Sequence, residues 1–78
     1  MAYYITSAGF EIDYADFKDA SLTFYLYKFG LGHYITLFLY EEIDLYCITI
    51  MNTRHMNEIG MNETDKKYFI ELQDVYCS

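Results

Sequence analysis

The clearest short-range pattern near the N-terminus is an alternation of apolar and polar residues. Every second residue of Phe10–Tyr14 is apolar, which is the period of a half-buried strand. Tyr3–Thr6 precedes it, separated by the turn Ser7–Gly9. We predict two short strands here. A short helix over Asp13–Ala20 is the alternative, because its aromatic residues would fall on one side.

Three central segments are dense in Tyr, Phe, Ile, Leu and Thr, most of which favour a pleated surface over a helix. They are Leu22–Phe29, His33–Tyr40 and Ile43–Met51. Gly30–Gly32 and Glu41–Glu42 separate them, and both connections are short enough for tight turns. These segments predict a three-stranded antiparallel meander, which the N-terminal strands extend to as many as five strands.

The best helical periodicity follows the polar stretch Asn52–Glu63, which we predict to be a loop. Thr64 is the predicted N-cap of the helix. The apolar residues after it fall on one face, namely Tyr68, Phe69, Leu72, Val75 and Tyr76. The predicted fold is a single α+β domain over residues 1–78: a small antiparallel sheet of three to five strands, with one C-terminal amphipathic helix packed on one face.

Alternation divides the predicted meander into two faces. The first is ordinary core, which we expect to pack against the helix: Leu22, Phe24, Leu26, Ile35, Leu37 and Leu39. The second carries Thr23, Tyr25, Tyr27, Tyr34, Thr36, Phe38 and Tyr40, and Tyr46 continues it. Tyrosine is enriched at protein interfaces, and a large aromatic patch rarely stays bare. The N-terminal segment, a second copy of the chain or a different protein would therefore cover this face.

Charge limits the kinds of partner. The 78 residues include twelve acids and five bases, for a net charge of −7. No basic stripe is present to neutralise phosphates, so we expect neither direct nucleic-acid binding nor binding to an anionic membrane. The longest apolar stretch is also far shorter than the about 20 residues of a membrane span. A basic protein surface is the favoured partner, and an apolar fraction of 54% excludes a disordered chain.

Candidate catalytic and metal-binding residues are few. Cys47 and Cys77 do not form a disulfide framework, and Met1–Phe10 lacks the features of a signal peptide, so we expect a cytoplasmic protein with free thiols. His33 and His55 lack the spacing of a zinc-ligand pair. Neither a nucleophile–base pair nor a glycine-rich phosphate loop is visible. We therefore predict no enzymatic activity, no metal and no cofactor.

An acidic cluster, Glu41, Glu42 and Asp44, lies at the predicted hairpin tip. These acids either keep a hydrophobic small protein soluble or imitate the phosphates of a nucleic acid, which carry about one charge per 1.7 Å of duplex axis. In the second case the target would be the basic groove of a nucleic-acid enzyme.

Short length, an excess of acids, abundant Tyr and Phe, and the lack of catalytic residues together give a recognisable profile. By this composition, not by a motif, the chain resembles the small acidic inhibitors that phages encode against host defences, including anti-CRISPR and anti-restriction proteins. The resemblance implies a protein-binding inhibitor of a nucleic-acid-handling effector. The alternatives are a structural module that forms a homodimer through its aromatic face, and a small-ligand binder. The predicted partner-binding residues are Tyr25, Tyr27, Tyr34, Tyr40, Glu41, Glu42, Asp44 and Tyr46.

Overall fold

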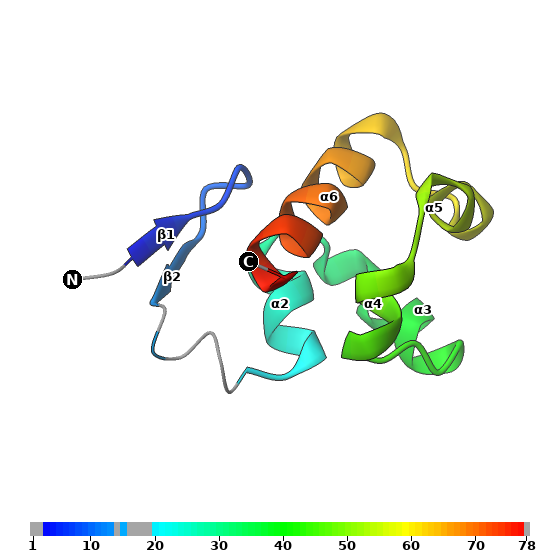
Figure 1. Cartoon of the computed structure of the whole chain (residues 1–78), viewed down its shortest axis with the longest axis horizontal. Coiled ribbons are helices and arrows are strands. Elements are labelled where there is room, and N and C mark those ends of the chain that lie inside the picture. Colours follow the sequence, from blue (N-terminus) through cyan, green and yellow to red (C-terminus); the bar gives the residue numbers. More distant parts are fainter. Residues whose placement is uncertain (1–2, 14, 16–19, 78) are drawn as a thin grey trace.

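The computed structural model describes residues 3–13, 15 and 20–77, and over these residues the chain is mainly helical with a small antiparallel sheet (Figure 1). The sheet pairs β1 (Tyr3–Ile5) with β2 (Glu11–Asp13). The helices are α2 (Leu22–Lys28), the 3-10 helix η1 (Gly32–Tyr34), α3 (Ile35–Tyr40), α4 (Leu45–Ile50), α5 (Thr53–Ile59) and α6 (Glu63–Cys77). The combination of α and β structure was predicted, but its proportions were not.

The N-terminal hairpin is confirmed. Tyr3 is paired with Asp13 and Ile5 with Glu11, and the backbone N–H of Thr6 donates to the carbonyl of Phe10 (2.9 Å) to close the turn. The alternative helix over Asp13–Ala20 lies mostly outside the described residues.

The predicted meander is wrong, because all three of its segments are helical. Two of the helices begin at side chains that accept a hydrogen bond from the first turn. Ser21 Oγ accepts from the N–H of Phe24 (3.4 Å), and Asp44 Oδ1 accepts from the N–H of Cys47 (2.9 Å). Caps and burial in the core outweigh the modest strand preference of the aromatic and β-branched residues.

Three of the helices end in the same left-handed turn. Gly30 follows α2 with a φ of 78°, and Gly60 follows α5 with a φ of 95°. After α3 the same position is taken by Glu42, at a φ of 57°, and the N–H of Ile43 donates back to the carbonyl of Phe38 (2.9 Å). The Glu41–Glu42 connection therefore ends a helix instead of turning a hairpin.

The loop predicted for Asn52–Glu63 is also wrong, because it contains α5. Asn52 and His55 form a reciprocal cap at the start of this helix. A C-terminal amphipathic helix is present as α6, but the prediction of one helix on a sheet face is wrong, because α6 is one of several helices and the sheet has two strands in the described residues. Its cap is Asn62, whose Oδ1 accepts from the N–H of Asp65 (2.8 Å). Thr64, the predicted cap, lies within the helix.

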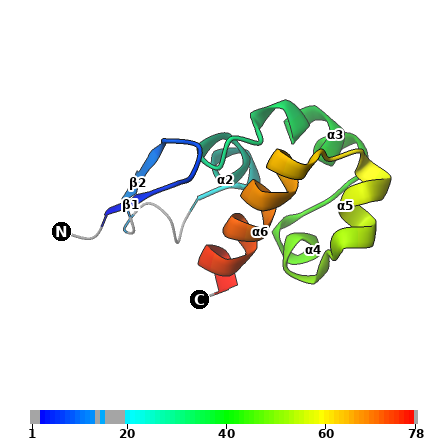
Figure 2. The same ribbon diagram turned by 90° about the horizontal axis from the view of Figure 1, so that it is seen from above.

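Helix α6 occupies the centre of the molecule, with the hairpin on one side and α4 and α5 on the other (Figure 1; Figure 2). It anchors both sides. Glu71 accepts hydrogen bonds from the hydroxyls of Tyr4 and Ser7, both at 2.8 Å. On the other side, Gln73 Nε2 donates to the carbonyls of Ile48 (2.8 Å) and Met51 (2.7 Å). The core around α6 includes Leu26, Phe29, Leu31, Phe38, Ile48, Phe69 and Leu72.

The core also corrects the predicted division into two faces. Phe38, assigned to the interaction face, is fully buried, and Leu39, assigned to the core, is exposed. Burial follows helical spacing, so the two-residue alternation had no structural basis here.

Candidate functional site

Four large apolar side chains project from α3 and α4 into solvent. Their exposed fractions are high: Leu39 65%, Tyr40 82%, Tyr46 70% and Ile50 59%. Leu39 and Tyr40 lie at the end of α3, and Tyr46 and Ile50 are one turn apart on the same face of α4. We call these four residues the α3–α4 surface.

Acidic residues occupy the turn between the two helices. Glu41, Glu42 and Asp44 are all exposed. A hydrogen bond from the backbone of Cys47 lowers the pKa of Asp44 below its ordinary value, so this carboxylate stays ionised well below neutral pH. The acidic turn therefore joins the two helices that carry the exposed apolar residues, next to Tyr40 in sequence.

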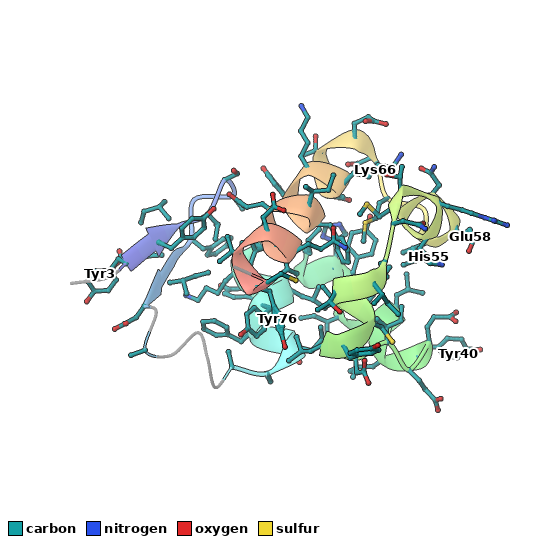
Figure 3. All side chains as sticks on the ribbon, in the orientation of Figure 1. Tyr3, Tyr40, His55, Glu58, Lys66 and Tyr76 are labelled. Atoms are coloured by element: carbon teal, nitrogen blue, oxygen red, sulfur yellow. The ribbon has the colours of Figure 1, made fainter. Side chains whose placement is uncertain are left out.

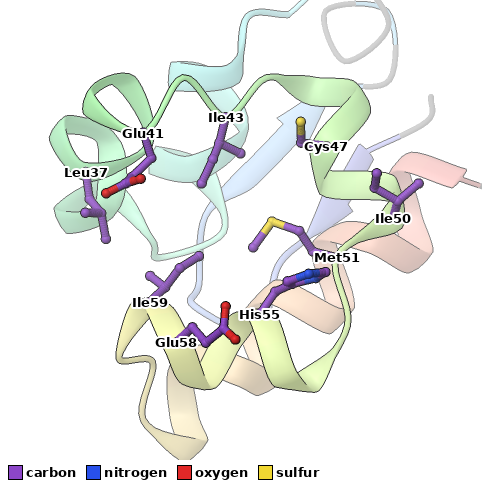
Figure 4. Close-up of a pocket in the computed structure, with 9 residues that line it drawn as sticks. All are labelled: Leu37, Glu41, Ile43, Cys47, Ile50, Met51, His55, Glu58 and Ile59. Atoms are coloured by element: carbon purple, nitrogen blue, oxygen red, sulfur yellow. The ribbon is translucent and has the colours of Figure 1, made fainter.

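A groove of about 430 Å³ lies between α3, α4 and α5 (Figure 4), within the size range of ligand and side-chain pockets. Its apolar lining is Leu37, Ile43, Ile50, Met51 and Ile59. Glu41, Cys47, His55 and Glu58 complete it. We call it the α3–α5 groove, and its wall at Ile50 is shared with the α3–α4 surface.

The polar groups of the groove have defined neighbours. His55 Nδ1 accepts from the backbone N–H of Asn52 (3.3 Å), so the neutral ring carries its proton on Nε2 and offers a donor. Glu58 Oε1 lies 3.4 Å from Nε of Arg54, and both side chains are exposed. Among the described residues neither lysine nor arginine lines the groove, and its carboxylates come from two different walls.

A second polar cluster joins η1 to the start of α6. The hydroxyl of Tyr34 donates to Asp65 Oδ2 (2.6 Å), and His33 Nε2 lies 3.1 Å from the same oxygen. Burial, together with this hydrogen bond and the charge of Asp65, raises the pKa of Tyr34 to about 12. The contacts satisfy a carboxylate that is largely buried, as a core requires, and we interpret the cluster as structural.

Five of the predicted partner-binding residues lie on α3, α4 and the turn between them: Tyr40, Glu41, Glu42, Asp44 and Tyr46. All five are exposed. Sequence alternation grouped them with three residues that the structure places elsewhere.

Those three residues are Tyr25, Tyr27 and Tyr34. Tyr25 and Tyr34 are core residues, 3% and 8% exposed, so they are not available to a partner. Tyr27 is exposed, but it lies on α2 with its ring 5.1 Å from that of Phe10, near the hairpin.

Sequence reasoning missed the α3–α5 groove altogether. Its walls come from α3 and α4, which were predicted as strands, and from α5, which was predicted as a loop. The signal that could have found them is the series of helix caps: Asp44 before α4 and Asn52 before α5.

Cys47 lines the groove, half-buried, and Cys77 is exposed; both are free thiols. Within the residues described, no group of three or more His, Cys, Asp and Glu is arranged to hold a metal ion. Over the same residues, no helix has the length and apolar character to cross a membrane.

Comparison with protein-family models, with curated proteins and with solved structures found no match.

Proposed function

We propose that this protein binds another protein through the α3–α4 surface, and that the acids beside it select a partner with a basic surface. The supporting observation is the exposure of Leu39, Tyr40, Tyr46 and Ile50 on two consecutive helices. Exposed apolar residues that gather beside polar ones are typical of interaction sites, and tyrosine is enriched there.

The acids favour a different protein over a symmetric homodimer. In a two-fold dimer through this surface both copies would bring the same acidic turn, Glu41 to Asp44, to one interface, and the surface itself carries no base to pair with these acids. Lysine or arginine on a partner would instead pair with these carboxylates and steer the approach. A nucleic-acid-handling effector has such a basic surface, and a protein that covered it would act as an inhibitor.

The test uses a double variant, Tyr40→Ala/Tyr46→Ala. The partner is captured from cells with the wild-type chain, purified, and titrated with each variant. Loss of two interface tyrosines is expected to weaken binding by about 2 kcal/mol or more, which is about 30-fold. The matched control is Tyr3→Ala/Tyr27→Ala, which removes two exposed tyrosines from the end of the molecule that carries the hairpin. Figure 3 shows Tyr3 and Tyr40 at opposite ends.

Equal affinity of the two double variants would contradict the assignment of the surface. Thermal unfolding of both variants shows whether the domain remains folded. Association with the partner should slow when salt is raised from low to physiological concentration, because exposed charges are screened. An association rate that does not change with salt would show that the acids do not attract the partner. In sedimentation, a dimer that dissociates on Tyr40→Ala/Tyr46→Ala would assign the surface to self-association.

A further inference from the structure

The α3–α5 groove extends the α3–α4 surface inward. Ile50 and the acidic residue Glu41 border both. Its apolar lining and its volume of about 430 Å³ suit the insertion of large apolar side chains from a partner. What enters the groove must therefore be apolar on one side.

The charged groups of the groove are acidic. Glu41 caps the end of α3 and Glu58 lies on α5, so carboxylates stand on two walls of the groove. Figure 4 shows both carboxylates beside the open space. A phosphate or carboxylate ligand would meet repulsion here, whereas lysine or arginine beside the inserted apolar residue would be attracted. Glu58 is already near Arg54, but this pair is exposed and therefore weak enough to exchange.

Helices form the walls of the groove. Backbone groups within a helix are already paired with one another, so an extended segment would find no strand edge here. In the described part of the chain the sheet is β1 with β2, which lies at the other end of the molecule (Figure 1). A helix brings its own backbone pairing and presents apolar residues at regular spacing. Helix-in-groove recognition is thus the mode that these walls allow.

Resting on the proposed protein-binding function, we infer that the α3–α5 groove receives the apolar face of a basic amphipathic helix of the partner. Leucine-like side chains enter between Met51 and Ile59, and flanking lysines or arginines meet Glu41 and Glu58. The net charge of −7 adds long-range attraction for such a helix.

The test uses Cys47 as a reporter, because its thiol lines the groove. In the Cys77→Ser chain, Cys47 is alkylated with N-ethylmaleimide in the presence of a synthetic peptide. The probe is a leucine–lysine peptide of about 15 residues, long enough to form a helix, with leucines on one face. At about ten times its Kd, occupancy of about 90% slows alkylation about tenfold.

Two control peptides define the recognition. One replaces every lysine by glutamate, and the other keeps the composition but alternates leucine with lysine, as in a strand. Neither is expected to protect Cys47. Protection by the glutamate peptide would overturn the charge requirement. Equal protection by the alternating peptide would overturn the helix requirement.

Two pairs of variants test the carboxylates. Glu41→Gln/Glu58→Gln should weaken binding of the leucine–lysine helix about fivefold, as expected for two exposed ion pairs. Glu11→Gln/Glu63→Gln changes the net charge equally, at exposed sites outside the groove, and should leave the affinity within about twofold. Equal weakening by both pairs would show a general charge effect and contradict the inference.

The complex with the natural partner separates this inference from the proposed function. If Tyr40→Ala/Tyr46→Ala abolishes binding but the partner leaves Cys47 alkylation unchanged, the groove is not occupied and only the proposed surface stands. If the partner protects Cys47 and the tyrosine variant binds normally, the groove stands and the proposed surface fails.

Discussion

Replacement of Glu42 by glycine perturbs one backbone position with few side-chain consequences. Glu42 is exposed, and among the described residues it is the only residue other than glycine with a positive φ, 57°. Gly30 and Gly60 occupy the equivalent turns after α2 and α5. A residue with a Cβ loses about 1–2 kcal/mol in this conformation. Glycine avoids that strain, but its greater freedom in the unfolded chain lowers the free energy of unfolding by about 0.5–1 kcal/mol. The balance is a stabilisation of about 0.5–1 kcal/mol.

The assay is urea denaturation of the wild-type, Glu42→Gly and Glu42→Ala chains. Alanine removes the carboxylate but keeps the Cβ, so the difference between the two variants is the backbone strain less the entropic cost of glycine, without any effect of the lost charge. Glu42→Gly should have the higher midpoint at an unchanged m-value, and its Tm should rise by about 2–8 °C. A glycine variant no more stable than the alanine variant would refute the claim that the turn is strained.

Three further predictions concern the core and its anchors. Gly30→Ala should destabilise the fold by at least about 2 kcal/mol, measured by urea denaturation, because a Cβ there would lie 2.7 Å from that of Ala8 at a φ of 78°. The pKa of Tyr34 is raised to about 12 in the folded state. The stabilisation from protonated Tyr34 is therefore fully present below the unfolded-state pKa of about 10, and the free energy of unfolding falls as the pH rises from about 10 to about 12. In Asp65→Asn the loss of stability should still begin near pH 10 but end at lower pH, because the pKa of Tyr34 falls only in the folded state. An unchanged pH profile would show that Asp65 does not contribute to the raised pKa of Tyr34. Glu71→Gln should weaken the contact between hairpin and helix by about 1–2 kcal/mol, seen as faster amide exchange in β1 and β2, and unaltered exchange would contradict this anchor.

The two ends of the chain were predictable because their patterns are local. Alternation at period two identified the strand Glu11–Asp13, and apolar spacing identified α6. The central segments were not, because their aromatic and β-branched residues favour strands in general. The competing information lay in single residues at the ends, Ser21 before α2 and Gly30 after it. Such a pair predicts a helix even when the residues between them do not.

The site was predictable only in part. The acidic turn and its neighbours Tyr40 and Tyr46 adjoin in sequence, so any local structure keeps them close together. Tyr25 and Tyr34 were assigned to the same face by alternation, which a helix does not follow. The groove depends on three helices meeting, and no local pattern reports that arrangement.

The hydrogen bonds from Gln73 to α4 determine how ordered the groove is before the proposed partner binds. α4 has only six residues. The side-chain amide of Gln73 donates hydrogen bonds to two carbonyls at the end of this helix, those of Ile48 and Met51. A helix this short has little cohesion of its own, so its position is held from across the core by α6. The groove wall is therefore ordered in advance, and less conformational entropy is lost on binding. If the groove binds the proposed helix, substitutions of Gln73 would alter that affinity although Gln73 does not line the groove.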